Sequence, residues 1–395
     1  MPVTVSSPLE PVDHVAPVVD VIDDVQSFTA LRADWTGLLR NSESNSPFLT
    51  WEWLHAWWTH LSESRVLKLV TVRGTDGELI GVAPLCESRG RLPWLTQLEF
   101  LGTGWAGSDY LDVLARRGRE GECIDALADW FERRPQTVRF DHIPRGAVAA
   151  QVSQQLSQAG WSRQTFRSGI CPFATLAGHS WESYVDTLGS SQRTRCRRYL
   201  NTLRKKFDLR FERAESEAQR QEMLSALIAF HEERWTPRGG STAFQTAALQ
   251  AFHHDVTARA LNAGWLRLCA LRLDDEIAAV TYCFHVNDRV YLYQHGFSRR
   301  YWQYSTGLVA LGLTIRAAIE EGAAEFDMLY GDEPYKALWA SNTRPLERIE
   351  LFPSHISGRL QRRTADAERG MRMLARRIFP RKPCDSNVPP AGVAS

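Results

Sequence analysis

The sequence lacks the features that mark membrane-spanning, secreted and zinc-binding proteins. No stretch reaches the roughly 18 apolar residues that a spanning helix needs, and the N-terminal residues show no basic start followed by an apolar core, so no secretory signal is expected. The seven cysteines are odd in number and form no CxxC motif, which argues against a disulfide framework and against a zinc site. We therefore expect a cytoplasmic protein without a metal.

The sequence also lacks an excess of charge. Its 395 residues carry a net charge of only +1, so the composition gives no reason to expect a nucleic-acid partner. Basic residues gather in two segments, 190–207 and 353–395. The first could serve an acidic or phosphorylated acceptor, a cofactor phosphate, or no ligand at all. In the second, apolar residues alternate with arginines, so weak contact with anionic lipid and a solvated tail are the two alternatives.

What the sequence does contain, within 290–339, is a strand, a polar loop, a helix and a second strand. The run VYLYQHGF is typical of a strand covered on both faces, and LVALGLTIRAAIEEG predicts an amphipathic helix that ends at Gly322. The loop before the helix would leave backbone N–H groups free for an anion, with a glycine allowing close approach. The expected phosphate-binding residues are Gly296, Arg299, Arg300, Tyr304, Ser305, Thr306 and Gly307.

An internal repeat suggests that the chain contains a second, similar unit. LKLVTVRGTDGELIGVAPLC and LRLCALRLDDEIAAVTYCF both read as a strand, an acidic turn and a strand. Each hairpin is followed by a helix and then by a short strand, RFD at 139–141 and EFD at 325–327. This order favours a duplication, and hence two tandem α/β (α+β) lobes, each a mixed twisted sheet flanked by helices. Two unrelated α/β segments are the alternative.

Four motifs carry a family resemblance: SDYLD at 108–112, FHEERW at 230–235, YSTG at 304–307 and FDMLYGDEPYK at 326–336. They resemble the CelD-like acetyltransferases of cellulose biosynthesis, a GNAT family related to the two-lobed FemAB-type transferases. The resemblance covers most of 48–352. It implies tandem GNAT-like lobes, with the acyl-CoA pyrophosphate on the loop before the long helix. Relatives commonly carry proline where Thr306 stands, although threonine can still cap the helix.

The resemblance and the repeat together predict five segments. Residues 1–19 form a flexible tail, and 20–163 form a degenerate lobe that binds no CoA. An inter-lobe strand and a basic helix occupy 164–210, and the acyl-CoA-binding lobe occupies 211–352. A basic tail, 353–395, ends the chain.

Acyl transfer to an amine needs a base, a donor for the carbonyl oxygen and an acid for the leaving thiolate. Asp332 and Glu333 are the candidate bases, and Tyr335 is the candidate acid. Lys336 could hold a phosphate or an acceptor carboxylate. The alternative is that GDEPYK is an ordinary turn. Asp327 could either face the cleft or brace a loop.

The acceptor is expected to meet residues from both lobes. Asp109 and Tyr110 of SDYLD are expected to line the acceptor side of the binding cleft, with a structural turn as the alternative. His231 and Arg234 of FHEERW are further substrate-binding candidates, although a lone histidine on a helix is more often a structural hydrogen-bond partner. The glycine-rich turn that follows could act as a lid.

Three functions remain open from the sequence. The first is an N-acyltransferase that moves an acyl group from acetyl-CoA or another acyl-CoA, used as a co-substrate, to the amine of a small molecule, an amino sugar or an envelope or polysaccharide precursor. The second is a FemAB-like transferase that uses aminoacyl-tRNA, against which the low net charge weighs. The third is a scaffold in envelope or polysaccharide assembly without catalytic activity, against which the intact STG turn and GDEPYK weigh.

Overall fold

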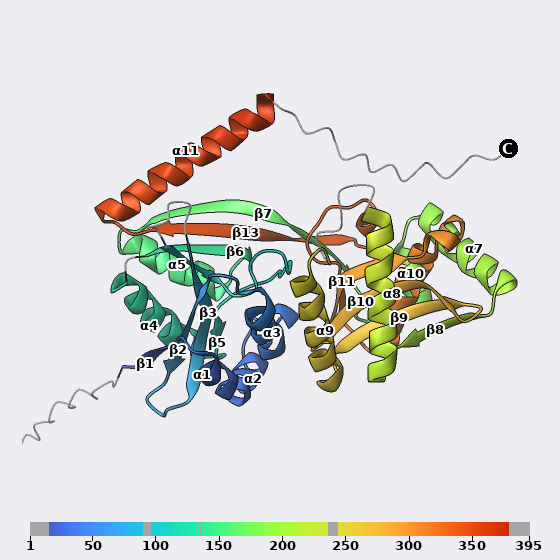
Figure 1. The fold of residues 1–395 in the computed structure, drawn as a ribbon, viewed down its shortest axis with the longest axis horizontal. Coiled ribbons are helices and arrows are strands. Elements are labelled where there is room, and N and C mark those ends of the chain that lie inside the picture. The colour runs from blue at the N-terminus through green and yellow to red at the C-terminus, as the bar shows by residue number, and fades with distance from the viewer. Residues whose placement is uncertain (1–15, 90–95, 135, 236–243, 379–395) are drawn as a thin grey trace, which may run out of the picture.

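The computed structural model describes residues 16–89, 96–134, 136–235 and 244–378. Within these residues, thirteen strands form one continuous sheet that runs through two lobes. Figure 1 shows the lobes side by side, each with helices packed against its part of the sheet. This architecture confirms the predicted α/β fold of two tandem lobes.

The N-terminal lobe contains six strands and five α-helices, with a short 3-10 segment before α3. The strands are β1 (Val18–Ile22), β2 (Val66–Arg73), β3 (Leu79–Arg89), β4 (Thr96–Phe100), β5 (Leu114–Ala115) and β6 (Thr137–Pro144). The helices are α1 (Val25–Ala30), α2 (Arg32–Arg40), η1 (Pro47–Leu49), α3 (Trp51–Leu61), α4 (Glu120–Glu132) and α5 (Val148–Gln158).

The C-terminal lobe repeats much of this plan. Its strands are β8 (Leu209–Arg213), β9 (Leu266–Leu273), β10 (Glu276–Val286), β11 (Arg289–Phe297) and β12 (Glu325–Asp327). Its helices are α6 (Trp181–Thr187), α7 (Ser190–Lys206), α8 (Glu217–Trp235), α9 (Ala247–Asn262), η3 (Arg299–Tyr304), α10 (Thr306–Glu320) and η4 (Lys336–Leu338).

The repeated hairpins of the sequence occupy equivalent places in the two lobes. β2 pairs with β3, and β9 pairs with β10, both antiparallel. Each lobe then has one parallel pair, β4 with β6 and β11 with β12, as a crossover through a helix requires. That helix is α4 in one lobe and α10 in the other. The short RFD and EFD segments are therefore equivalent strands, as the repeat predicted.

Two long strands cross from one lobe to the other, β7 (Ser162–Thr175) and β13 (Asn342–Phe352). They pair with each other along the whole of β13. β13 also pairs with β6 of the N-terminal lobe, whereas the end of β7 pairs with β12 of the C-terminal lobe. Each lobe thus completes its sheet with a strand that follows the other lobe in sequence. The sequence predicted an inter-lobe strand but not this exchange.

β13 carries one arginine for each lobe. Arg348 forms an ion pair with Asp141 of RFD, and Arg344 lies 2.8 Å from Asp327 of EFD. Both aspartates are buried. Because a buried carboxylate is costly without a cation beside it, the two arginines couple the position of β13 to both lobes.

The predicted N-terminal tail needs one correction. Residues 1–15 lie outside the described part of the chain, but Val18 and Val19, at the end of the expected tail, already pair with Arg73 and Val72. Backbone hydrogen bonds to the edge of the sheet therefore order this end of the segment.

Aromatic side chains fill the junction between α3 and the C-terminal lobe. The Trp53 ring centroid lies 4.9 Å from that of Phe252, 5.7 Å from that of Phe284 and 5.4 Å from that of Tyr293. The Trp53 indole donates to Ser108 Oγ at 2.9 Å. Offset and edge contacts of this kind add about 0.5–1.5 kcal/mol each to the burial of the rings, so the junction is part of the core.

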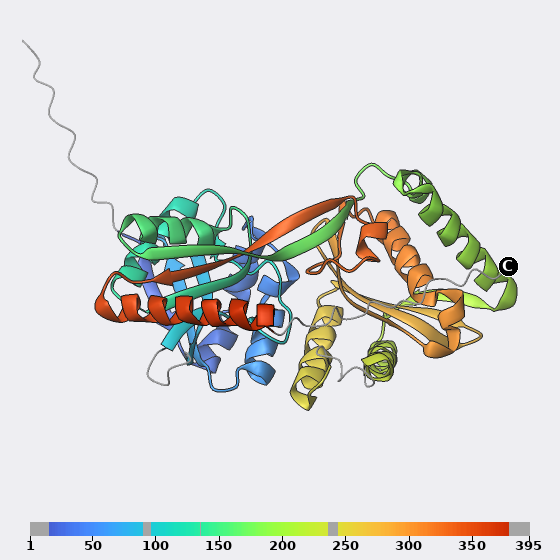
Figure 2. The same ribbon diagram turned by 90° about the horizontal axis from the view of Figure 1, so that it is seen from above.

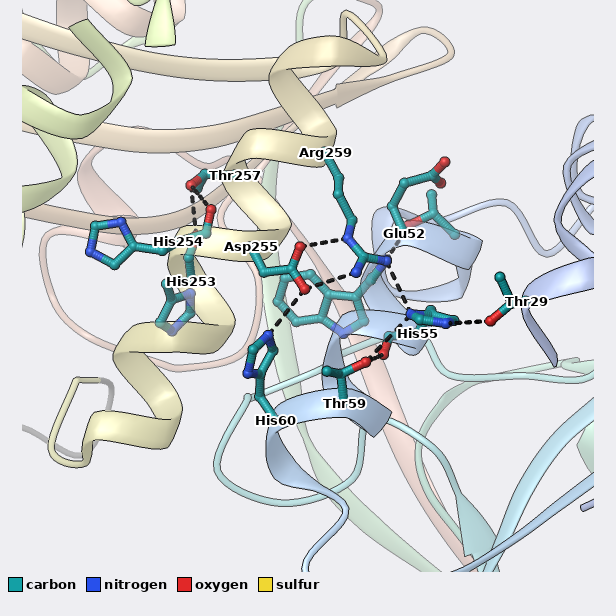
Figure 3. A network of polar contacts seen from close by, with 12 residues as sticks. Thr29, Glu52, His55, Thr59, His60, His253, His254, Asp255, Thr257 and Arg259 are labelled. Atoms are coloured by element: carbon teal, nitrogen blue, oxygen red, sulfur yellow. Dashed lines mark hydrogen bonds and ion pairs between the residues drawn. The ribbon is translucent and has the colours of Figure 1, made fainter. Parts of the chain in front are cut away.

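Polar residues of α3 and α9 join the lobes beside this core (Figure 3). Asp255 accepts from Arg259 at 2.6 and 2.8 Å and lies 3.0 Å from His60 Nε2. Arg259 also lies 3.1 Å from His55 Nδ1, and His55 Nε2 lies 3.0 Å from Thr29 Oγ1. Since a guanidinium can only donate, His55 Nδ1 must accept, and the ring proton is on Nε2.

This arrangement predicts a pH-dependent stability. Burial, followed by the charge of Arg259, lowers the pKa of His55 from 6.5 to about 4, although Asp255 opposes the shift. Between these values the unfolded chain binds more protons than the folded chain, so the free energy of unfolding falls as the pH falls from about 6.5 to about 4. We expect His55→Asn, which keeps an acceptor for Arg259, to remove this part of the dependence.

Urea unfolding of both proteins at about pH 7 and about pH 4.5 measures the effect. The wild type should lose more stability than His55→Asn over this interval. Equal losses would show that His55 does not titrate in this way.

Candidate functional site

A cavity of about 330 Å³ lies between the lobes, where β11 and β12 separate. These strands pair only from Arg289 to Tyr291, after which β11 continues and β12 ends. β11 also carries one extra residue, Tyr293, opposite the step from Tyr282 to Cys283 of β10. Such a bulge bends a strand and interrupts its pairing, so it helps to open the sheet at this point.

Both lobes line the cavity. The N-terminal lobe contributes Trp105, Ala106, Gly107, Asp109 and His142. The C-terminal lobe contributes Leu292, Tyr293, Gln294, His295, Met328, Leu329, Tyr330, Glu333, Tyr335 and Lys336. Four of the residues singled out in the sequence, Asp109, Glu333, Tyr335 and Lys336, therefore lie around one cavity.

Asp109 connects the lobes at the cavity wall. Its Oδ2 accepts from the backbone N–H of Tyr330 at 2.8 Å, and its Oδ1 lies 3.2 Å from His142 Nδ1. The His142 and Tyr330 rings meet edge to face at 5.2 Å. Asp109 is buried, and His142 is partly exposed. The carboxylate therefore holds the chain that leaves β12 and lies close to the imidazole, whose Nδ1 makes no hydrogen bond among the described residues.

Asp327 braces the turn after β12 rather than facing the cavity. Its Oδ1 accepts from the N–H of Leu329 at 2.7 Å, and Leu329 has a left-handed φ of 57°. Its Oδ2 accepts from Tyr110 Oη at 2.6 Å and from Arg344 at 2.8 Å. Burial raises the pKa of Asp327 to about 6, and these hydrogen bonds and the Arg344 charge oppose the rise. Tyr110 is thus a partner of Asp327 and is not a lining residue.

The GDEPYK segment places its side chains in different environments. Lys336 is buried and donates to the carbonyl oxygens of Leu329 and Tyr330 at 3.2 and 2.6 Å. Its Nζ lies 3.0 Å from Glu333 Oε2 at the cavity. Tyr335 lies against His295, with 4.8 Å between ring centroids. Asp332 is exposed and is not among the lining residues.

The start of α10 carries unused donors. Among the described residues, no hydrogen bond is made by the N–H of Thr306 or of Gly307 or by the buried Thr306 hydroxyl. Ser305 is the N-cap residue, but its φ of 53° is left-handed and its side chain does not cap the helix. Thr306, which the sequence suggested as a cap, is instead the first helical residue, and its hydroxyl caps nothing among the described residues. Gly307 is partly exposed, so its free N–H and the positive end of the helix fit a phosphate, whereas Thr306 is buried.

Three residues predicted to contact the cofactor have other neighbours. A Cβ at Gly307 would come within 2.7 Å of the Phe297 ring, and one at Gly296 would come within 2.9 Å of Leu227 on α8. Both glycines therefore serve close packing. Arg300 pairs with Glu276 at 2.6 Å.

The remaining basic groups lie around the same loop. Arg299 is exposed and makes none of the ion pairs found among the described residues. α7 packs beside η3 and α10. The hydroxyl of Ser305 lowers the pKa of Tyr199 on that helix through a hydrogen bond, and Lys206 Nζ lies 5.1 Å from the centroid of the Tyr304 ring.

His231 is mostly buried, and its Nε2 lies 3.2 Å from the carbonyl oxygen of His295. This contact ties α8 to β11 behind the cavity wall, in line with the structural alternative. The side chain of Arg234 and the expected lid at 236–243 lie outside the described residues.

Among the lining residues that sequence reasoning did not propose for the site are Trp105, His142 and His295. His295 lies in the strand that the sequence did identify. His142 follows RFD, at the place that corresponds to Met328 after EFD. The repeat was therefore the signal that could have found His142, since it puts the residue after RFD and the residue after EFD at equivalent positions.

Comparison with known proteins identifies a domain and a fold. Residues 190–337 match the family model described as acetyltransferase (GNAT) domain. No curated protein matches the chain. Among solved structures, FemX has a TM-score of 0.62 at 10% identity, over 84% of this chain and 97% of FemX.

Two further structures show the same fold over most of their length. A conserved protein of unknown function from Bacteroides thetaiotaomicron has a TM-score of 0.54 at 10% identity, over 85% of this chain and 99% of that chain. L-PGS from Bacillus licheniformis has a TM-score of 0.50 at 12% identity, over 85% and 93%.

None of the described helices is long and apolar enough to cross a membrane. Over the same residues, no group of three or more His, Cys, Asp or Glu side chains is placed to hold a metal ion.

From the family match and the structural similarity, residues 190–337 form a GNAT acetyltransferase-like domain within a two-lobed chain whose fold is similar to that of FemX.

Proposed function

We propose that this protein is an N-acyltransferase that moves an acyl group from acyl-CoA to an amine, by direct attack with both substrates bound. The acceptor class that we propose is a small molecule, an amino sugar or a polysaccharide precursor, as in the CelD-like family that the motifs resemble. The observation that carries the proposal is the cavity between the lobes. Residues of the C-terminal lobe, which also carries the free donors of α10, line one side of this cavity. Residues of the N-terminal lobe line the other side.

The donor side is the start of α10. The N–H of Gly307, a partly exposed residue, is available to phosphate oxygens. The N–H and the hydroxyl of Thr306 make no hydrogen bond among the described residues either, but Thr306 is buried, so they would reach a phosphate only after a local shift of the loop. The helix dipole favours negative charge at this end. Arg299 and the basic face of α7 add positive charge nearby. These groups fit the pyrophosphate of a CoA ester.

The acceptor side contains a histidine beside a carboxylate. His142 borders the cavity, its Nδ1 lies 3.2 Å from Asp109 Oδ1, and its ring packs edge to face on Tyr330. We assign His142 as the base, because Asp332 does not line the cavity and Glu333 is paired with Lys336. The amine nitrogen forms a bond to the acyl carbon, the carbon–sulfur bond breaks, and His142 takes the amine proton. Tyr335, on the cavity wall, is the group that we assign to protonate the thiolate.

The donor assignment predicts that acetyl-CoA stabilises the protein. At about a hundredfold over its dissociation constant, a ligand that binds only the folded state adds about 2.7 kcal/mol, which thermal unfolding detects. We expect Thr306→Val, which removes a buried hydroxyl without a described partner, to unfold without ligand at the wild-type temperature or above it, and to be stabilised less by acetyl-CoA. Thr306→Ser, which keeps the hydroxyl, should respond as the wild type does.

Gly307→Val would be a poorer probe, since its side chain would collide with Phe297. If neither acetyl-CoA nor longer acyl-CoAs stabilised the wild type, the donor assignment would be wrong. If Thr306→Val responded fully, the phosphate would lie elsewhere.

The base assignment predicts a loss of turnover in His142→Asn. Asparagine suits the left-handed backbone at this position, where φ is 55°, so the fold should persist. General-base catalysis contributes about 10²–10⁴-fold, and we expect kcat to fall by a factor in this range. Asp332→Asn is the matched control, in which an exposed carboxylate outside the cavity is neutralised, and it should keep nearly full activity.

Steady-state kinetics with labelled acetyl-CoA and a panel of amines provides the measurement. Loss of activity in Asp332→Asn with full activity in His142→Asn would reverse the assignment.

The fold similarity to FemX over 84% of the chain supports a second candidate, a transferase that takes its acyl group from aminoacyl-tRNA. The two candidates share the cavity and differ in the donor. Transfer from charged tRNA without stabilisation by any acyl-CoA would favour the second.

A further inference from the structure

The last described helix, α11 (Ile356–Ile378), turns its apolar side chains toward solvent. Ile356, Leu360, Met371 and Leu374 have exposed fractions of 84%, 52%, 62% and 58%. Their spacing, together with the exposed Ala367, puts them on one side of the helix. We call these five residues the outer face of α11.

The opposite side of α11 is attached to the protein by polar contacts. α11 starts near the end of β13 and extends over the N-terminal lobe (Figures 1 and 2). Thr137 donates to Gln361, Arg369 pairs with Glu350, and Gln164 donates to Asp366 at 3.2 Å. An amphipathic helix normally packs its apolar side on the core. Here the polar side is on the protein, and the apolar side is uncovered.

The charge of α11 indicates what covers the outer face. The helix carries seven arginines against two acidic residues, a net charge of +5, and the sequence continues with Arg381 and Lys382. Arg359, Arg362 and Arg363 line a hollow of about 510 Å³ between α11 and the N-terminal lobe. Arg363 is exposed and has no ion pair among the described residues. A stripe of apolar residues beside a cluster of arginines is typical of helices that lie in the interface of an anionic membrane.

We propose that α11 binds an anionic lipid surface, with its outer face among the acyl chains and its arginines on the lipid phosphates. The protein body then stays on the water side of the interface, held through β13. A second copy of the chain fits less well, because two helices of net charge +5 repel each other at the contact. In addition, the heptad positions that would form a dimer seam from Ile356 include Arg363, Gly370 and Arg377.

Co-sedimentation of the full chain with vesicles tests the proposal. We expect binding to vesicles of phosphatidylglycerol and phosphatidylcholine, little binding to phosphatidylcholine alone, and weaker binding as salt screens the charges. Arg363→Gln should weaken binding about fivefold, as expected for one cation near an anionic surface. Replacing Leu360, Met371 and Leu374 together by glutamine should weaken it at least about tenfold.

The matched control replaces Val25 and Val66 by glutamine, two exposed apolar residues of the N-terminal lobe away from α11. This control should bind as the wild type does. All variants should keep the wild-type unfolding temperature, since the replaced side chains are exposed.

Equal binding to both kinds of vesicle, or full binding by the triple variant, would overturn the proposal. So would a dimer in sedimentation velocity that the triple variant abolishes, because the outer face would then be covered by a second copy.

Discussion

The exchange of β7 and β13 is the constraint on which the rest of the structure depends. Each strand belongs to the sheets of both lobes, so the lobes cannot separate without breaking a continuous hydrogen-bond ladder. Arg344 and Arg348 add a charge contact from β13 to each lobe. The cavity between the lobes therefore has walls in a fixed relation, as a site that must align two substrates requires.

The two lobes share a plan but differ beside the parallel pair of strands. After β11, the chain forms η3 and opens α10 with unused donors. After β4, the corresponding residues are 101–113. Leu101, Ser108 and Leu111 of this segment are buried, and Trp53 donates to Ser108. Side chains thus occupy this part of the N-terminal lobe, which agrees with our proposal that acyl-CoA binds the C-terminal lobe. The N-terminal lobe supplies Asp109 and His142 to the cavity instead.

Local patterns predicted much of this fold. The amphipathic run before Gly322 is α10, the two hairpins are β2–β3 and β9–β10, and the duplication is visible in the strand order. The strand exchange could not be predicted. The sequences of β7 and β13 are those of ordinary strands, and the pairing of strands far apart in the chain leaves no periodic pattern in the sequence. The same limit applied to the site. The carbonyl partners of Lys336 and the packing of Gly307 against Phe297 both depend on segments that the sequence alone does not place.

The central claim is that the donor binds at the start of α10 and beside the inter-lobe cavity. Hydrogen–deuterium exchange of the intact protein with and without saturating acetyl-CoA tests it most directly, because amides that contact a ligand exchange more slowly. The account predicts slower exchange in 298–310 and 328–336, with 101–113 of the N-terminal lobe much less affected. Protection confined to 101–113, or none in either region, would contradict it.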